Sequence, residues 1–117
     1  MKTIPKGETL AVVGMKELHG ANWNATVEEI TRQFDSNGAR CIELDLSEAT
    51  FIDPHGLGAL IVLNRTAQRR NGRLRLVNPS WMARQILEMT QMHRLIPIEN
   101  DNLEDPVPIS VQPSRNW

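Results

Sequence analysis

The side chains with the clearest potential for chemistry in this 117-residue chain are two histidines and an aspartate: His19, Asp53 and His55. Imidazole nitrogens and carboxylate oxygens bind transition metals, and imidazole also takes up and releases protons near neutral pH. The three residues do not share the short spacing of a local ligand motif, so only the fold can bring them together.

The residue pattern gives little support to an enzyme. No glycine-rich loop is followed by Lys-Ser or Lys-Thr, and the Gly56-Leu57-Gly58 run is too short to cradle a nucleotide phosphate. Ser47, Thr50 and Ser80 have no recognisable base beside them in the sequence, so a nucleophile, a base and an orienting group cannot be assembled. We expect a non-enzymatic protein that uses no cofactor.

A strand followed by a helix should position Asp53 and His55. Apolar residues alternate over 42–46, as in a strand, and Phe51 and Ile52 extend the apolar run to the turn. Asp53 is suited to cap the next helix because its carboxylate can accept from the amides of the first turn, and Pro54 suits the first helical position. Helical spacing of apolar residues then continues until Asn71-Gly72.

Similar patterns predict the other elements. We expect a pair of short N-terminal strands, one over 10–13 and one ending near Leu18, joined through Gly14-Met15. A helix should follow from Asn24 or Thr26, with Thr26 and Glu29 as a capping box and Gly38 as a left-handed end. After the central helix we expect a strand over 74–77, a helix capped by Ser80 and reaching Thr90, and a short strand over 95–98. Alternating strands and helices indicate one α/β domain over residues 1–99. Prolines predict an extended C-terminal tail over 100–117.

The charges are unevenly distributed, although the net charge is only −1, which argues against a general nucleic-acid binder. Arginines gather around the end of the central helix: Arg65, Arg69, Arg70, Arg73 and Arg75. They are either favourable cations at a helix C-terminus or a basic patch that docks an acidic partner.

The expected location is the cytoplasm. Cys41 is the only cysteine, which fits a reducing compartment and excludes an internal disulfide. The first ten residues lack the long apolar core of a signal peptide. No apolar stretch approaches the roughly 20 residues that span a bilayer, so we expect no membrane insertion.

The segment around Asp53 is similar to a known family. DPHGLG at 53–58, with GARCIELDLSEATFID before it and GRLRLVNPS and LEMTQMHRLIPI after it, resembles the STAS domain of bacterial anti-sigma factor antagonists over roughly residues 8–98. In that family a strand ends in aspartate and Ser-Ser-Gly-Leu-Gly opens a helix. A partner kinase that doubles as the anti-sigma factor phosphorylates the second serine. Here Asp53, Gly56, Leu57 and Gly58 match, but Pro54 replaces the first serine and His55 replaces the phosphoacceptor.

The resemblance implies a small mixed β-sheet with helices packed mainly on one side. It also implies a protein–protein interaction domain that regulates transcription by binding a serine-kinase-like anti-sigma factor. The residues expected to contact this partner are His19, Asn22, Asp53, Pro54, His55, Gly56, Leu57 and Gly58. Imidazole offers a serine kinase nothing to phosphorylate, so His55 predicts constitutive binding or a different partner.

A second departure from the family lies at the end of the second strand, where Gly-x-Leu-Asp is replaced by Lys16-Glu17-Leu18-His19. By the resemblance, His19 and His55 would face each other across one end of the sheet. With Asp53 they would then form a ligand- or metal-binding sensor, which is an alternative hypothesis. His55 is then a surface residue of a non-switchable binder, a ligand- or pH-sensing contact, or a phosphohistidine or catalytic group. His93, in a predicted turn, should be an exposed polar residue.

Two questions about the whole chain stay open. Within the family, the alternative to an anti-sigma factor antagonist is a STAS subunit of a signalling scaffold or of a transport system. The sequence also does not decide between a monomer and a homodimer.

Overall fold

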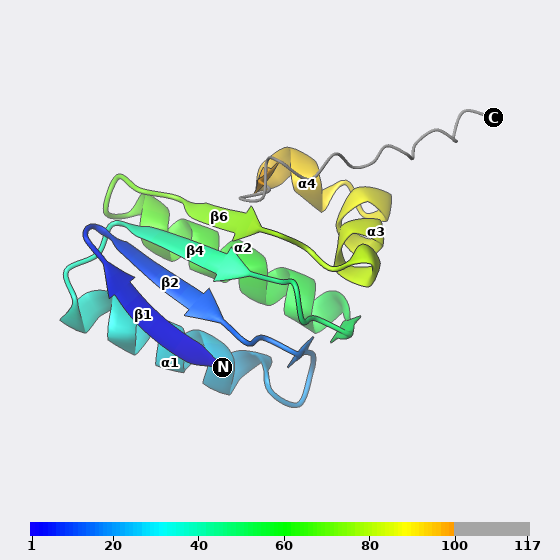
Figure 1. Cartoon of the computed structure of the whole chain (residues 1–117), viewed down its shortest axis with the longest axis horizontal. Helices are drawn as coiled ribbons and strands as arrows, with labels where there is room; N and C mark the ends of the chain where they lie inside the picture. Colours follow the sequence, from blue (N-terminus) through cyan, green and yellow to red (C-terminus); the bar gives the residue numbers. More distant parts are fainter. Residues whose placement is uncertain (100–117) are drawn as a thin grey trace.

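The computed structural model describes residues 1–99, so the expected tail over 100–117 lies outside the described residues. The described chain forms seven strands and four helices (Figure 1). In order these are β1 Lys2–Lys6, β2 Thr9–Val13, β3 Glu17–Leu18, α1 Trp23–Ser36, β4 Cys41–Asp45, β5 Phe51–Ile52, α2 Pro54–Gln68, β6 Leu74–Val77, α3 Trp81–Met89, α4 Met92–Leu95 and β7 Ile98–Glu99.

Five of the strands form the main sheet, in the order β1-β2-β4-β6-β7. β1 is antiparallel to β2, whereas β2, β4, β6 and β7 are parallel neighbours. Figure 1 shows α1 and α2 behind this sheet, with α3 and α4 toward the end to which β4 and β6 point. The predicted mixed sheet with helices mainly on one side is therefore confirmed.

The core lies between the sheet and the helices. In β4 the buried Ile42 and Leu44 alternate with half-buried Cys41, Glu43 and Asp45, as the period of two requires. Helix α1 buries Val27, Ile30 and Phe34, and α2 buries Ala59, Leu60, Leu63 and Ala67.

The other face of the sheet carries a line of ion pairs. Lys6 lies 3.5 Å from Glu43, and Arg75 lies 2.9 Å from Glu43 and 2.8 Å from Glu99. Arg73 lies 3.4 Å from Glu99. Because Arg70 also pairs with Asp35 at 2.7 Å, three of the five clustered arginines are neutralised within the fold. This arrangement leaves less charge for an acidic partner than the sequence alone suggested.

The prediction that the strand over 10–13 pairs with the strand ending near Leu18 is wrong. β2 pairs with β1, through a turn in which Gly7 has φ +62°, whereas β3 pairs with β5 in a separate sheet. β1 was not predicted because its lysines and Pro5 weaken the strand pattern. These are the residues that protect an exposed sheet edge from further pairing.

The predicted continuous run from 42 to 52 is also divided. β4 ends at Asp45, whose carboxylate accepts from the Ser47 amide at 2.8 Å, and Ala49 donates to the Leu46 carbonyl at 3.2 Å. These turn bonds redirect the chain before β5 begins. Phe51 therefore belongs to the two-stranded sheet and not to the main one.

Helix α1 begins earlier than predicted. The Thr26 amide donates to the Asn22 carbonyl at 3.0 Å, so Thr26 is already inside the first turn and the predicted capping box is wrong. The predicted left-handed Gly38 is confirmed, with φ +65°.

The C-terminal part of the domain differs slightly from the prediction. The last strand is β7 at Ile98–Glu99, and the short helix α4 precedes it. His93 is half-buried and not exposed, because its Nδ1 lies 3.3 Å from the Leu87 carbonyl oxygen. No helix over residues 1–99 is long and apolar enough to cross a membrane.

Candidate functional site

The candidate site begins at the two-stranded sheet. Leu18 of β3 pairs in parallel with Ile52 of β5, and the Asp53 amide donates to the Leu18 carbonyl at 3.2 Å. Each strand is followed by a helix N-terminus, α1 after β3 and α2 after β5. The next residues, His19 and Asp53, therefore leave the sheet side by side, although they are far apart in the sequence.

Asp53 joins the two segments through its carboxylate. Its Oδ1 accepts from the Gly56 amide at 2.9 Å, which confirms Asp53 as the N-cap of α2, and its Oδ2 accepts from the Gly20 amide at 3.1 Å. Burial favours a higher pKa for Asp53. The amides of Gly56 and Gly20, with nearby His55, outweigh burial and hold the pKa of Asp53 below its usual range. The carboxylate is thus a fixed negative charge at the helix start.

Gly56 allows α2 to approach β3 closely. A Cβ at this position would lie 2.1 Å from the Leu18 carbonyl oxygen, closer than any side chain tolerates. Gly56 is buried and Leu57 is half-buried against the core. Both residues therefore lie beneath the surface, whereas Pro54 and His55 are exposed on it.

The loop between β3 and α1 is held by its own polar groups. The His19 amide donates to Asn22 Oδ1 at 2.9 Å, and Asn22 Nδ2 donates to the Glu17 carbonyl at 2.9 Å. The Ala21 amide donates to His19 Nδ1 at 3.2 Å, while His19 Nε2 lies 3.1 Å from Glu17 Oε1. Asn22 therefore organises the loop. We call residues 19–22 the His19 loop.

His55 is the exposed tip of the α2 N-terminus. Its side chain is 67% exposed, and its Nδ1 lies 3.8 Å from Asp53 Oδ2. The ring lies against Gly20, where a Cβ would come within 3.2 Å of Nδ1. Beside His55 is an open hollow of about 280 Å³, also lined by Trp23, Pro54, Gly58 and Val62. This hollow is almost entirely apolar, so the site offers one imidazole beside a surface suited to an apolar group.

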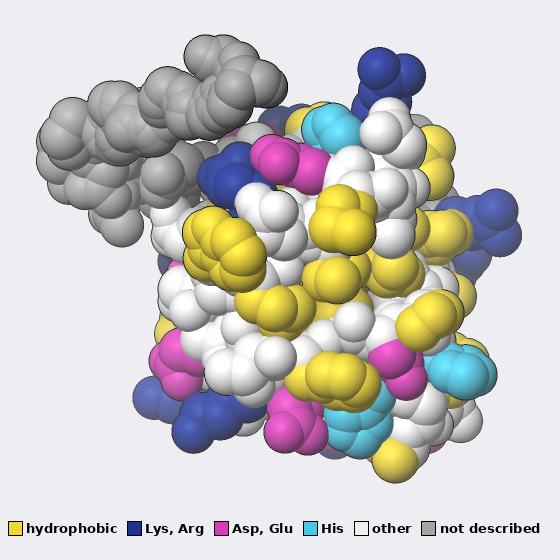
Figure 2. Space-filling view, turned by 90° about the vertical axis from the view of Figure 1, so that its right-hand side faces the viewer, with side chains coloured by type: hydrophobic (Ala, Val, Ile, Leu, Met, Phe, Trp, Pro, Cys, Tyr) yellow, Lys and Arg dark blue, Asp and Glu magenta, His cyan; other side chains and the backbone are white. Residues whose placement is uncertain are grey.

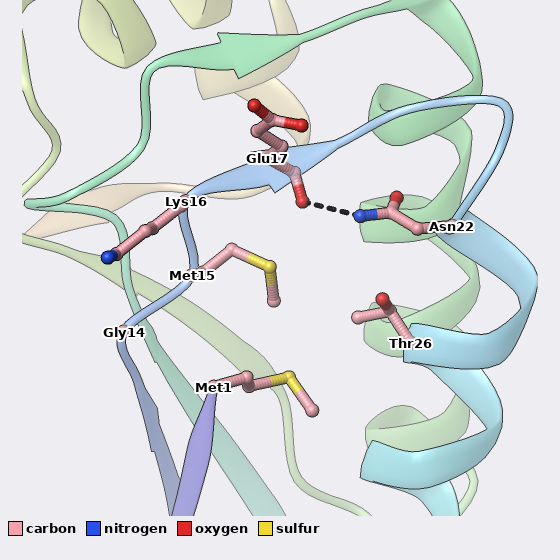
Figure 3. Close-up of a pocket in the computed structure, with 7 residues that line it drawn as sticks. All are labelled: Met1, Gly14, Met15, Lys16, Glu17, Asn22 and Thr26. Carbon is pink, nitrogen blue, oxygen red and sulfur yellow. Dashed lines mark hydrogen bonds between the residues drawn. The ribbon is translucent and has the colours of Figure 1, made fainter.

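A second hollow lies on the other side of the His19 loop. It measures about 490 Å³ and is lined by Met1, Gly14, Met15, Lys16, Glu17, Asn22 and Thr26. Figure 3 shows the hydrogen bond from Asn22 to Glu17 at its rim and the two methionine side chains extending into it. Its lining is mixed, without a cluster of ligating groups.

The two histidines do not form the site expected from the resemblance. The His19 ring packs on Phe51, with 5.8 Å between ring centroids, whereas the His55 ring packs on Gly20. Both Asp53 oxygens accept backbone amides. No three His, Cys, Asp or Glu side chains within residues 1–99 are grouped to hold a metal ion. The metal-binding arrangement of His19, His55 and Asp53 is therefore wrong for the described structure.

Two residues of the site were missed from the sequence: Trp23 and Phe51. Phe51, which was expected only to extend the apolar run to the turn, is 50% exposed next to His19. Figure 2 shows that hydrophobic side chains gather on this end of the molecule, with histidines at the border of the group. The signal for Phe51 and Trp23 was only their position beside a predicted helix start, which does not distinguish packing from exposure.

Comparison with known proteins supports the fold and the family. A family model described as the STAS domain matches residues 6–104. Three similar solved structures share 16–22% identity with the chain, which shows a common fold. No curated protein matches the chain significantly.

The three structures cover most of both chains. TM1081 from Thermotoga maritima, a candidate anti-sigma factor antagonist, has 22% identity and a TM-score of 0.78, covering 88% of each chain. The unphosphorylated Bacillus anti-sigma factor antagonist SpoIIAA has 18% identity and a TM-score of 0.73, covering 88% of this chain and 89% of its own. An anti-sigma factor antagonist from Mycobacterium paratuberculosis has 16% identity and a TM-score of 0.70, covering 89% of this chain and 86% of its own. The chain belongs to the STAS domain family.

Proposed function

We propose that this STAS domain is a non-enzymatic regulator that binds a serine-kinase-like anti-sigma factor and so frees a sigma factor for transcription. The proposed contact surface consists of the His19 loop and the start of α2, residues 53–58. The observation that carries the proposal is the exposed His55 on a capped helix start, beside an open apolar hollow. The structures named above, two of them of anti-sigma factor antagonists, support the choice of partner.

His55 changes how such a contact would be regulated. Phosphorylation of a serine brings about two negative charges to a helix start, and these charges can break a protein contact. His55 has no hydroxyl group, so a serine kinase cannot add this charge at position 55. We therefore propose that the complex is constitutive and forms in the cytoplasm, the compartment that the free Cys41 favours.

The test is recovery of the partner from a lysate of the native cells, using the full chain as bait and mass spectrometry as the readout. His55→Glu places a permanent negative charge in the proposed contact. A negative charge near a helix N-terminus also favours the helix, so the variant should fold. Gln68→Glu is the matched control, because it adds the same charge to α2 roughly 20 Å away, at an exposed position.

Wild type and Gln68→Glu should recover a kinase-like anti-sigma factor, whereas His55→Glu should recover at least about tenfold less, the effect of roughly 1.4 kcal/mol of lost binding. Equal recovery by His55→Glu would place the contact elsewhere. Recovery of a transporter or scaffold subunit in place of the kinase would instead identify a STAS subunit of such an assembly.

A further inference from the structure

The hydrogen bonds of the His19 loop select one tautomer of His19. Nδ1 accepts from the Ala21 amide at 3.2 Å, so this nitrogen must present a lone pair. The proton of the neutral ring is therefore on Nε2, which faces Glu17 Oε1 at 3.1 Å. In this form both ring nitrogens have suitable partners.

The contact between His19 and Ala21 has the connectivity of a familiar turn. When aspartate or asparagine occupies the first position of an Asx-turn, its side-chain oxygen accepts from the amide two residues later. His19 Nδ1 occupies the place of that oxygen. Imidazole differs from an amide oxygen in one respect: when it takes up a proton on Nδ1, it can no longer accept a hydrogen bond.

We propose that His19 is a positioning residue whose neutral form closes the His19 loop and whose protonated form releases it. On protonation, the N–H groups of Nδ1 and Ala21 point at each other, and the Ala21 amide must turn away. Ala21 is bonded to Gly20, whose amide binds Asp53 and whose backbone supports the His55 ring. Opening of the loop therefore disturbs the proposed contact surface at its centre.

Several groups face His19 from the surrounding elements. Glu17 of β3 accepts from Nε2–H in either protonation state, so this contact does not restore the Ala21 bond. Phe51 of β5 is uncharged. At the start of α2, Asp53 accepts from the Gly20 amide, and the His55 ring lies against Gly20, the residue next to His19. Because histidine side chains in general change charge between pH 5 and 8, the test covers this range.

His93 provides a control within the same chain. Its Nδ1 faces the Leu87 carbonyl oxygen at 3.3 Å, so this nitrogen must donate. Protonation of His93 then adds a proton to Nε2 and leaves the bond in place. The two histidines should thus respond to acid in opposite ways, although both make a backbone contact through Nδ1.

The first experiment is an NMR titration of the full ¹⁵N-labelled chain from pH 8 to pH 5, which needs no partner. The imidazole ¹⁵N shifts should show Nε2–H for neutral His19 and Nδ1–H for neutral His93. Ala21 amide exchange, corrected for its intrinsic pH dependence, should become about tenfold faster with the same midpoint as His19. The exchange rates of the amides around His93 should not change as His93 titrates. The proposal would be overturned if neutral His19 carried its proton on Nδ1. It would also be overturned if the exchange rate of the Ala21 amide did not change as His19 titrates.

Two variants separate the acceptor from the rest of the side chain. His19→Asn keeps an acceptor that does not titrate, so the Ala21 amide should stay protected across the whole range. His19→Ala removes the acceptor, and the Ala21 amide should exchange rapidly even at pH 8. If the alanine variant protects Ala21 as well as wild type does, His19 does not position the loop.

The effect on binding rests on the proposed function. Affinity for the anti-sigma factor should fall about tenfold from pH 8 to pH 5.5 in wild type, and less than twofold in His19→Asn. Equal falls in the two proteins would contradict control by His19. If no anti-sigma factor binds at any pH, the proposed function fails, but the NMR result still decides the behaviour of the loop.

Discussion

At Asp53, one carboxylate performs two local tasks. It caps α2 through Gly56 and fixes the His19 loop through Gly20. Both bonds favour the charged form, which is why the pKa of Asp53 is lowered despite the opposing effect of burial. The folded state therefore binds this proton less readily than the unfolded chain does.

The lowered pKa predicts how stability depends on pH. The contribution of the Asp53 charge should be complete above the ordinary carboxyl pKa of about 4, and lost as the pH falls through the lower folded value. Asp53→Asn keeps an oxygen acceptor but does not titrate at this position. In thermal unfolding from pH 6 to pH 2, the variant should lose less stability than wild type. The control Glu48→Gln, at an exposed position, should lose as much stability as wild type. If Asp53→Asn also loses as much stability as wild type, the Asp53 charge does not have the role assigned to it.

His55 leads to a second prediction at the scale of one residue. If the proposed contact surface has kept the geometry of the family, His55→Ser should create a hydroxyl group that the partner kinase phosphorylates. The measurement is transfer of phosphate to position 55 in a mixture of the two purified proteins with ATP, and His55→Ala is the control that cannot react. Proven binding of the serine variant without any phosphorylation would count against that geometry.

Among the elements, the contact of α2 with β3 depends on the absence of a side chain at Gly56. A Cβ there would meet the Leu18 backbone at 2.1 Å, whereas a Cβ at Gly58, half a turn further along the same helix, meets nothing within 4 Å. The two glycines therefore have different reasons to be present. Gly56 is required by packing, while Gly58 only weakens the helix and lines the hollow beside His55.

A pair of substitutions tests this difference. Gly56→Ala should reduce the free energy of unfolding by at least about 2 kcal/mol, because backbone must move to admit the methyl group. Gly58→Ala should leave it unchanged or raise it by about 0.5–1 kcal/mol, since alanine is the better helix former. Urea unfolding of both variants measures the effect. Similar values for the two would show that α2 does not approach β3 as described.

For the whole molecule, the ion pairs on the sheet face away from α1 and α2, here called the open face, join four strands of the main sheet. Lys6 on β1 reaches Glu43 on β4 across β2, and Arg75 on β6 links Glu43 to Glu99 on β7. The hydrogen bond from Arg75 holds the pKa of Glu99 below its usual value. Because β7 has only two residues, this link should help to hold it on the sheet.

Removing the central arginine tests the contribution of this network. Arg75→Met should lower the free energy of unfolding by about 1–2 kcal/mol, because it leaves two partly buried carboxylates without this partner. Arg84→Met removes an exposed helical pair with Glu88 and should cost about 0.5 kcal/mol or less. Hydrogen exchange at β7 should accelerate only in the first variant. Equal losses in both would mean that the open face adds no more than an ordinary surface pair.

Much of the fold could be predicted from the sequence where the signal is local. Asp53 and Ser80 cap their helices as predicted, with bonds to Gly56 and to Ala83, and Gly38 adopts the expected left-handed conformation. Each of these features depends on residues within one helical turn. The types and spacing of neighbouring residues are therefore enough to determine them.

The tertiary structure alone decided how the site is assembled. β3 and β5 have two residues each, too few to show a period, and their pairing sets His19 beside Asp53. The same pairing exposes Phe51 and brings Gly20 under His55. It also gives the two histidine rings different neighbours, Phe51 for His19 and Gly20 for His55. Parallel pairing joins residues more than 30 positions apart through backbone hydrogen bonds, which every residue type except proline can donate. The local sequence therefore does not reveal this pairing.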